Sequence, residues 1–187
     1  LGVLVGRPEA ADSLARRIRC RLDAVAGVTG GSPVRSVYVD VWEDPPYTVG
    51  AGSFLDSLVT LAGGRNVFGD LPAPSPRVSI EAIAARDPDL VLVPLTPGSG
   101  RTPPEARPAW DAVPAVADGR LRTVDGDLVD RLGPRVPEAA AAVARALHPE
   151  LDAELRGLAS RDRCAGESEA GTPDRRRAAA HPGAPVG

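Results

Sequence analysis

The sequence predicts an α/β fold: a small parallel sheet with helices on both faces, preceded by one long helix. Helical and strand patterns alternate along most of the 187 residues. The run Leu90–Val93 is uninterrupted and apolar, which is typical of a strand buried on both faces of a parallel sheet. A long amphipathic stretch stands before the first strand pattern. Together these observations favour a parallel sheet with right-handed crossovers over an all-helical or all-β fold.

The long helix is expected from Pro8 to Ala26, because proline suits a first helical turn and Gly27 follows as a stop signal. Its apolar residues recur at three- and four-residue spacing, which places them on one stripe: Ala11, Leu14, Ala15, Ile18, Leu22 and Val25. Its other faces carry the arginines Arg16, Arg17, Arg19 and Arg21. A solvated helix face is the favoured interpretation of these arginines, and an anion-binding site is the alternative.

The first strand is expected at Ser36–Val41, a β-branched run. The segment Trp42–Gly52, with two prolines and two glycines, is predicted to be a loop. A helix then begins after Ser53, with Asp56 at the capping-box position.

A second short helix is expected at Ile80–Arg86, capped by Ser79 and ended by the Asp-Pro pair that follows. The stretch Asn66–Arg77 before it holds three prolines and is expected to be irregular.

The rest of the chain continues the alternation. A long polar loop at 95–108 precedes a short helix and turn at 110–117, a strand at Leu121–Val124 and a polar loop up to Pro134. The last helix is predicted to begin at Pro134 or Arg135 and to end before Pro149. From about residue 159 onward there is no periodicity, which predicts a disordered tail.

Composition excludes several classes of protein. The net charge is −3 and all 22 basic residues are arginine, so no nucleic-acid partner is expected. No apolar run is long enough to span a bilayer. No signal peptide is recognised at the start, and since the first residue is not Met, we expect the chain to begin partway into a longer product. Cys20 and Cys164 are interpreted as two unrelated thiols rather than as a disulfide.

The residues needed for common catalytic chemistries are missing from the sequence. His148 stands at a helix end and His181 in the tail, so neither fits a triad or a metal cluster. The chain has no lysine, which excludes Schiff-base chemistry and a phosphate-loop lysine. No catalytic residue, metal or cofactor is therefore predicted, and the protein is not expected to be an enzyme.

The fold class itself indicates where a ligand would bind. In open parallel sheets, ligands meet the loops beyond the carboxyl ends of the strands. Here those loops are 42–52, 95–108 and 125–134, and they make Trp42, Tyr47, Asp127 and Arg131 candidate binding residues. For the acidic group that includes Asp125, a polar turn is the simpler interpretation than acid–base chemistry.

Two stretches carry a resemblance to a known family: PPYTVGAGSFLDSLVTLAGGRNVFGDLP and RVSIEAIAARDPDLVLVP. They resemble the C-terminal lobe of the cobalamin/ferric-siderophore class of ABC-importer substrate-binding proteins, and the similarity extends from Pro8 to about Glu150. The resemblance implies two α/β lobes joined by one helix, with ligand in the cleft between them. It divides this chain into an interlobe helix at 1–27, a C-terminal lobe at 33–150, and a helix end with a disordered tail at 151–187.

The resemblance also implies roles for single residues. Tyr47 matches an aromatic that packs on the ligand, while Asp127 and Arg131 match polar positions of the cleft. Asp125 is their less supported neighbour. Trp42 has no match and is interpreted as either cleft or core, whereas Trp110 is expected to pack structurally.

Glu81 is implied to dock onto arginines of the membrane permease. It also stands in the first turn of a helix, where the helix dipole alone favours a carboxylate.

The implied function is the solute-binding component of an ABC importer for a metal chelate such as cobalamin, a ferric siderophore or haem. Its partners would be the permease and the chelate, with a monomeric state and a periplasmic or extracytoplasmic location, membrane-anchored lipoprotein included. No N-terminal lobe is recognised in the chain, so we expect weak binding or none by this chain alone. A small α/β enzyme or regulatory domain acting on a small polar ligand is the alternative function, and a remnant that binds nothing is a third.

Overall fold

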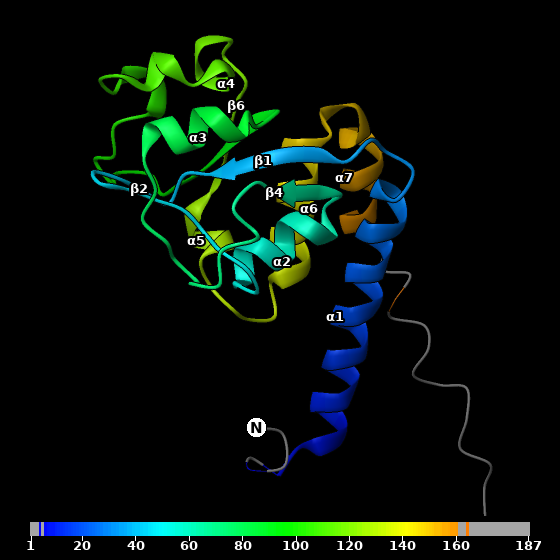
Figure 1. Cartoon of the computed structure of the whole chain (residues 1–187). Helices are drawn as coiled ribbons and strands as arrows, with labels where there is room; N and C mark the ends of the chain where they lie inside the picture. Colours follow the sequence, from blue (N-terminus) through cyan, green and yellow to red (C-terminus); the bar gives the residue numbers. More distant parts are fainter. Residues whose placement is uncertain (1–3, 5, 161–163, 165–187) are drawn as a thin grey trace, which may run out of the picture.

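One four-stranded sheet organises the molecule, with helices on both of its faces (Figure 1). The computed structural model describes residues 4, 6–160 and 164. All strand pairs of this sheet are parallel, in the order β4-β1-β5-β6. The strands are β1 (Arg35–Val39), β4 (Gly64–Asn66), β5 (Leu90–Leu95) and β6 (Leu121–Asp125). The predicted fold class is confirmed.

The long helix α1 (Pro8–Thr29) precedes the sheet, and its amino-terminal half extends away from the other elements (Figure 1). Pro8 occupies the first turn, as predicted. The helix does not stop at Gly27, because helical glycine is only unfavourable, not forbidden. It continues to Thr29, and Gly30 donates its N–H to the carbonyl of Ala26.

The two capped helices are α2 (Phe54–Leu61) and α3 (Ile80–Arg86), and both caps are confirmed. Ser53 and Ser79 each accept a hydrogen bond at 3.2 Å from the backbone N–H three residues later. Asp56 does not reach back to Ser53 and instead accepts from the N–H of Gly52 at 3.1 Å.

Four short elements were not predicted. Strand β4 lies between the helix expected after Ser53 and the irregular stretch expected from Asn66, and it shares only Asn66 with that stretch. The loop after β1 contains a hairpin of β2 (Trp42–Glu43) and β3 (Pro46–Tyr47). The polar loop after β6 contains a helix, α5 (Gly126–Val129). Each is too short to show a periodicity in the sequence.

The remaining helices follow loops of the carboxyl-terminal half. They are η1 (Pro104–Ala106), η2 (Trp110–Ala112), α4 (Pro114–Ala117), α6 (Val136–Leu147), η3 (Pro149–Leu151) and α7 (Asp152–Ser160). No separate helix was predicted for the segment of α7. That helix packs on α1 and α6, and Leu155 within it is fully buried. The predicted tail lies outside the described residues, apart from Cys164 and the end of α7.

Side chains alternate between two hydrophobic layers along the central strands. Val37 and Val39 of β1 join the layer formed with α1, α2, α6 and α7. Tyr38, between them, joins the layer formed with α3, η2 and α4. The centres of both layers are inaccessible to solvent, since Val37, Tyr38 and Val39 are each 0% exposed. The sheet is therefore rigidly packed on both faces.

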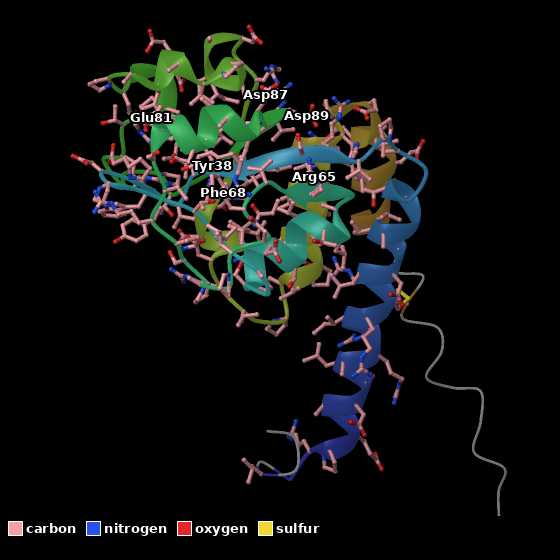
Figure 2. The ribbon with its side chains drawn as sticks, viewed as in Figure 1. Tyr38, Arg65, Phe68, Glu81, Asp87 and Asp89 are labelled. Carbon is pink, nitrogen blue, oxygen red and sulfur yellow. A yellow bond between two sulfur atoms is a disulfide. The ribbon has the colours of Figure 1, made fainter. Side chains whose placement is uncertain are left out.

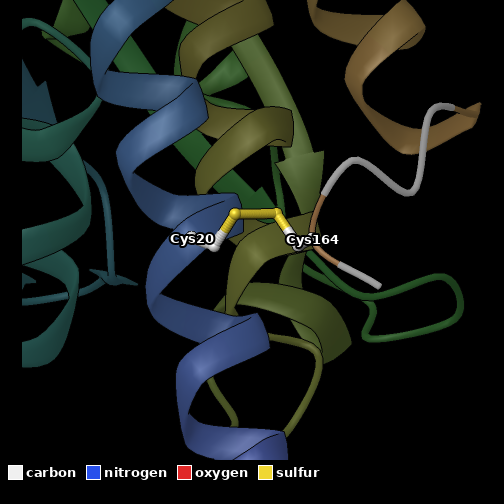
Figure 3. Close-up of a disulfide and its surroundings, with 2 residues drawn as sticks. All are labelled: Cys20 and Cys164. Carbon is white, nitrogen blue, oxygen red and sulfur yellow. A yellow bond between two sulfur atoms is a disulfide. The ribbon is translucent and has the colours of Figure 1, made fainter. Parts of the chain in front are cut away.

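Cys20 of α1 and Cys164 form a disulfide (Figure 3), so the interpretation as unrelated thiols is wrong. The two residues are 144 positions apart, and no spacing rule connects them. They meet because α7 lies alongside α1, which returns the chain to the helix where it began.

No helix among the described residues has the length and apolar character needed to cross a membrane.

Candidate ligand-binding site

The candidate site lies at the edge of the sheet where β1, β5 and β6 end. From β1 the chain crosses through α2 on one face of the sheet, whereas from β5 it crosses through η2 and α4 on the other face. The loops after β1 and β5 therefore diverge, which is the topological switch point where open parallel sheets bind ligands.

The hairpin after β1 presents two predicted binding residues together. Trp42 pairs directly with Tyr47 in the register of β2 and β3. Trp42 is 55% exposed and Tyr47 is half-buried. Trp42 is therefore not a core residue.

The hairpin is held in place by the proline-rich stretch that follows β4. Val78 donates its N–H to Pro46, Thr48 donates to Pro76 and Gly50 donates to Pro74, at 3.0 to 3.2 Å. Prolines cannot donate these hydrogen bonds, but their carbonyls accept them.

Gly50 makes this contact possible. A Cβ at that position would lie 2.0 Å from the carbonyl oxygen of Ala73. Only glycine therefore permits the close approach of the two segments.

The polar side chains after β6 are arranged by α5. Asp125 caps this helix and accepts the N–H of Asp127 at 3.0 Å. Asp127 and Arg131 form an exposed ion pair at 3.0 Å. They line a shallow pocket of about 100 Å³ together with Leu132, which is 77% exposed. Asp125 thus caps the helix, while the ion pair of Asp127 and Arg131 is accessible on the surface.

Asp130 is the other acidic residue of this segment. Partial burial raises the pKa of its carboxyl group, while the nearby charge of Arg101 lowers that pKa. The segment after β6 is in this way electrostatically connected to the loop after β5.

A buried ion cluster that we did not predict joins the loops after β1 and β5. Asp40, directly after β1, is 0% exposed. Its Oδ1 and Oδ2 atoms accept hydrogen bonds from Nη1 and Nη2 of Arg107 at 2.9 and 2.8 Å. Oδ2 also accepts one from Nη2 of Arg101 at 2.9 Å. The only sequence signal was a single carboxylate closing an apolar strand, followed much later by arginines in a polar loop.

Two aromatic rings pack beside this ion cluster. The guanidinium of Arg107 lies 4.9 Å from the ring centre of Trp110, which is cation–π geometry. Trp110 packs against Tyr38, with ring centres 5.9 Å apart. Burial raises the pKa of the Tyr38 hydroxyl. Trp110 is 2% exposed, so its predicted packing role agrees with its position.

Glu81 lies apart from these residues, in the first turn of α3 at the end remote from α1 (Figure 2). Its side chain is exposed. Hydrogen bonds from its own backbone N–H and from Ser79 lower the pKa of the carboxyl group. The carboxylate of Glu81 is thus accessible on the surface.

A cavity of about 320 Å³ lies between α1, α5, α6 and α7 and not at the ends of the strands. No group of histidine, cysteine and carboxylate side chains in the described segments is arranged to hold a metal ion.

The model of the periplasmic binding protein family matches residues 1–128. The chain belongs to this family. An ABC transporter substrate-binding lipoprotein of Bacillus subtilis is 28% identical over 154 residues, which are 80% of this chain and 48% of the relative. A vitamin B12-binding protein of Salmonella choleraesuis is 32% identical over 87 residues, or 46% of this chain and 33% of the relative.

Solved structures agree with the fold. A possible iron-binding periplasmic solute-binding protein of Staphylococcus epidermidis superposes with a TM-score of 0.69 at 27% identity, covering 79% of this chain and 58% of that chain. A periplasmic haem-binding protein of Roseiflexus gives a TM-score of 0.68 at 20% identity, covering 79% of this chain and 59% of that chain. The chain spans about half the length of the curated relatives that match most of it.

Proposed function

We propose that this chain is the carboxyl-terminal lobe and interlobe helix of the solute-binding component of an ABC importer for a metal chelate of the cobalamin, ferric-siderophore or haem class. The observation that supports this most directly is the hairpin, which holds exposed Trp42 beside Tyr47 at the switch point of the sheet. Aromatic faces pack well on large, flat or apolar ligands. The names of the relatives, which are substrate-binding and B12-binding proteins, point to the same class of solute.

The proposed cleft wall consists of an aromatic pair and a polar pair. Trp42 and Tyr47 supply stacking area, whereas Asp127 and Arg131 supply polar contacts beside a shallow pocket. Asp125 contributes by capping α5 rather than by contact.

Glu81, at the exposed start of α3, is the proposed docking residue for the permease.

The division of the chain follows from this proposal. Residues 1–27 would be the interlobe helix and 33–150 the lobe, although α1 itself ends at Thr29. Such a protein works outside the cytoplasmic membrane, and a lipoprotein anchor is consistent with the Bacillus subtilis relative. The proposed partners are the permease and the chelate, with a monomeric protein.

The two tryptophans provide a direct test. Trp42 is 55% exposed at the proposed wall, while Trp110 is 2% exposed and serves as an internal control. In ¹H–¹⁵N NMR spectra, each indole N–H gives its own signal, and Trp42→Phe assigns them. Titration of the 187-residue chain with dicyanocobalamin, gallium-loaded siderophores and gallium protoporphyrin should shift the Trp42 signal with weak affinity, because one lobe supplies one wall.

Saturable shifts of Trp42, Tyr47 and the amides of α5 with at least one chelate are the expected result. The proposal fails if none of the chelates shifts these signals, or if the shifts concentrate on the opposite edge of the sheet.

A further inference from the structure

We propose that Asp40 is a positioning residue of the binding site: it holds the loop at 96–109 against the end of β1 and beside the hairpin that carries Trp42 and Tyr47, so that this side of the cleft is already formed without ligand. The inference rests on the proposed function as far as the cleft is concerned. The positioning itself depends only on contacts within the described chain.

Asp40 joins the end of β1 to the loop after β5. Its carboxylate binds Arg107 through both oxygens and Arg101 through one. Its own backbone carbonyl accepts a further hydrogen bond from Arg101 at 3.1 Å. Arg101 in turn donates to the carbonyl of Pro94, in β5, at 2.9 Å.

The loop has little else to hold it. Gly98 and Gly100 have φ of +78° and +69°, and most of residues 97–106 are exposed. Within the described chain, the backbone hydrogen bonds donated at Ser99, Ala106 and Arg107 are all accepted by residues of the same loop. A segment with few apolar contacts and local hydrogen bonds has low local stability. The ion cluster is therefore its main anchor to the sheet.

A second contact extends the anchor to the aromatic hairpin. Oε2 of Glu43, in β2, accepts the backbone N–H of Thr102 at 3.1 Å and lies 3.7 Å from Nε of Arg107. The segment that carries Trp42 and the loop after β5 are thus fixed to each other across the switch point. Displacing the loop would therefore change its distance from the hairpin that carries Trp42.

The pair of Asp40 and Arg107 is well suited to hold the loop in place. A fork-shaped guanidinium bound through two nitrogens fixes orientation as well as distance, and both partners are buried, with 0% of the Asp40 and 5% of the Arg107 side chain exposed. A buried charge that loses its partner is strongly unfavourable, so the loop is not free to leave while both groups are present.

Hydrogen exchange on the full chain tests the positioning without any ligand. In Asp40→Asn, the amides of Ser99, Thr102 and Ala106 should exchange at least about 10-fold faster, as expected when a local anchor is lost, while those of Val91 and Val93 in β5 stay protected. The matched control is Asp70→Asn, which removes a bidentate Asp–Arg pair with Arg86 on an exposed part of the surface.

Arg101→Gln is the second variant, since it leaves the Asp40–Arg107 pair in place if Asp40→Asn fails to fold. It should accelerate the same loop amides to a smaller extent. Loop amides that exchange in the wild type as fast as in an unstructured peptide, or that are unchanged in the variants, would overturn the positioning role.

Ligand titration then tests the consequence for binding. With the chelate that shifts Trp42 in the wild type, the dissociation constant should rise about 10-fold in Asp40→Asn or Arg101→Gln, because the variant has to order the loop on binding. Asp70→Asn should bind as the wild type does. Equal affinities in all variants would overturn this part. A wild type that binds none of the chelates would instead refute the proposed function and leave the exchange result to decide on positioning.

Discussion

Oδ2 of Asp89 accepts hydrogen bonds from both the backbone N–H and the hydroxyl of Ser36, at 2.6 and 2.8 Å. Ser36 lies in β1 and Asp89 directly precedes β5, so this contact joins the two central strands at their amino ends. Asp40 and Arg107 join the loops of the same two strands at their carboxyl ends. The central strand pair is therefore fastened at both ends, and only the second fastening lies at the proposed site.

The Asp89 contact predicts a pH dependence of stability. Hydrogen bonds from the backbone and side chain of Ser36 lower the pKa of Asp89 in the folded protein. A carboxyl group with a lowered pKa stabilises the fold above its unfolded pKa of about 3.9. This contribution is lost as the pH falls through the lower, folded value. The free energy of unfolding of Asp89→Asn, measured with urea, should therefore be lower than that of the wild type at neutral pH. Its decrease between pH 6 and pH 3 should be smaller than in the wild type.

The comparison is made with Asp111→Asn, an exposed aspartate in η2. This control should keep the wild-type pH profile. A profile for Asp89→Asn that is parallel to the wild type at every pH would contradict the assignment.

The disulfide predicts a large effect of reduction. It closes a loop with a sequence separation of 144 residues, and cross-links of long loops restrict the unfolded chain strongly. Replacing both cysteines by serine should lower the free energy of unfolding by about 2–4 kcal/mol. Wild-type protein unfolded in the presence of dithiothreitol should show the same loss, whereas the double variant should not respond to the reductant. An unchanged urea midpoint for both would contradict a stabilising bond.

Two glycine-to-alanine substitutions should have opposite effects. At Gly50 the new Cβ would lie 2.0 Å from one backbone oxygen and 2.6 Å from another, and backbone atoms cannot move aside cheaply. Gly50→Ala should therefore destabilise the protein by about 3 kcal/mol. At Gly27, inside α1, a Cβ would meet nothing within 4 Å. Gly27→Ala should stabilise the protein by about 0.5–1 kcal/mol, because alanine loses less backbone entropy in a helix.

Thermal unfolding of the two variants checks this pair. The Gly50 variant should also broaden the NMR signals of Trp42 and Tyr47, since the hairpin is fixed through the contact that it disrupts. A Gly50 variant as stable as the wild type would refute the close contact of the two segments.

The proposed docking role of Glu81 predicts a change in association rate. Exposed charges at the rim of an interface mainly affect the rate of association and its salt dependence. Glu81→Arg should slow binding of the protein to the proposed permease in nanodiscs about 10-fold at low salt, with little effect on folding. The matched control is Glu154→Arg, an exposed glutamate of α7. Equal association rates for Glu81→Arg and the wild type would exclude docking through this residue.

Much of the fold could be predicted from the sequence because its signals are local. Ser53 and Ser79 indicate where α2 and α3 begin, because each caps its helix through a hydrogen bond to the N–H three residues later. Strand β5 is indicated by a continuous apolar run. The hairpin and β4 could not be predicted, since two or three residues show no period. Strand β4 forms because it pairs with β1. The hairpin is held because Pro46 accepts the N–H of Val78, and because Thr48 and Gly50 just after it donate to Pro76 and Pro74.

The candidate site divides in the same way. Tyr47, Asp127 and Arg131 were found from their places after predicted strands, and the structure puts each at the edge of the sheet that was expected. Asp40, Arg101 and Arg107 were missed, because a lone aspartate and two loop arginines have no meaningful spacing. Their relation appears only when two parallel strands bring residues about sixty positions apart into contact.

The sequence by itself thus determined the longer helices, the serine caps of α2 and α3, the strands β1, β5 and β6 and the edge of the sheet where a ligand is expected, since these depend on neighbours along the chain. Only the tertiary structure decided which side chains share that edge, that Trp42 is exposed there, that Asp40 binds Arg101 and Arg107 of the loop after β5 and that Cys20 reaches Cys164. Each of these depends on contacts between residues distant in sequence, and local patterns carry no record of them.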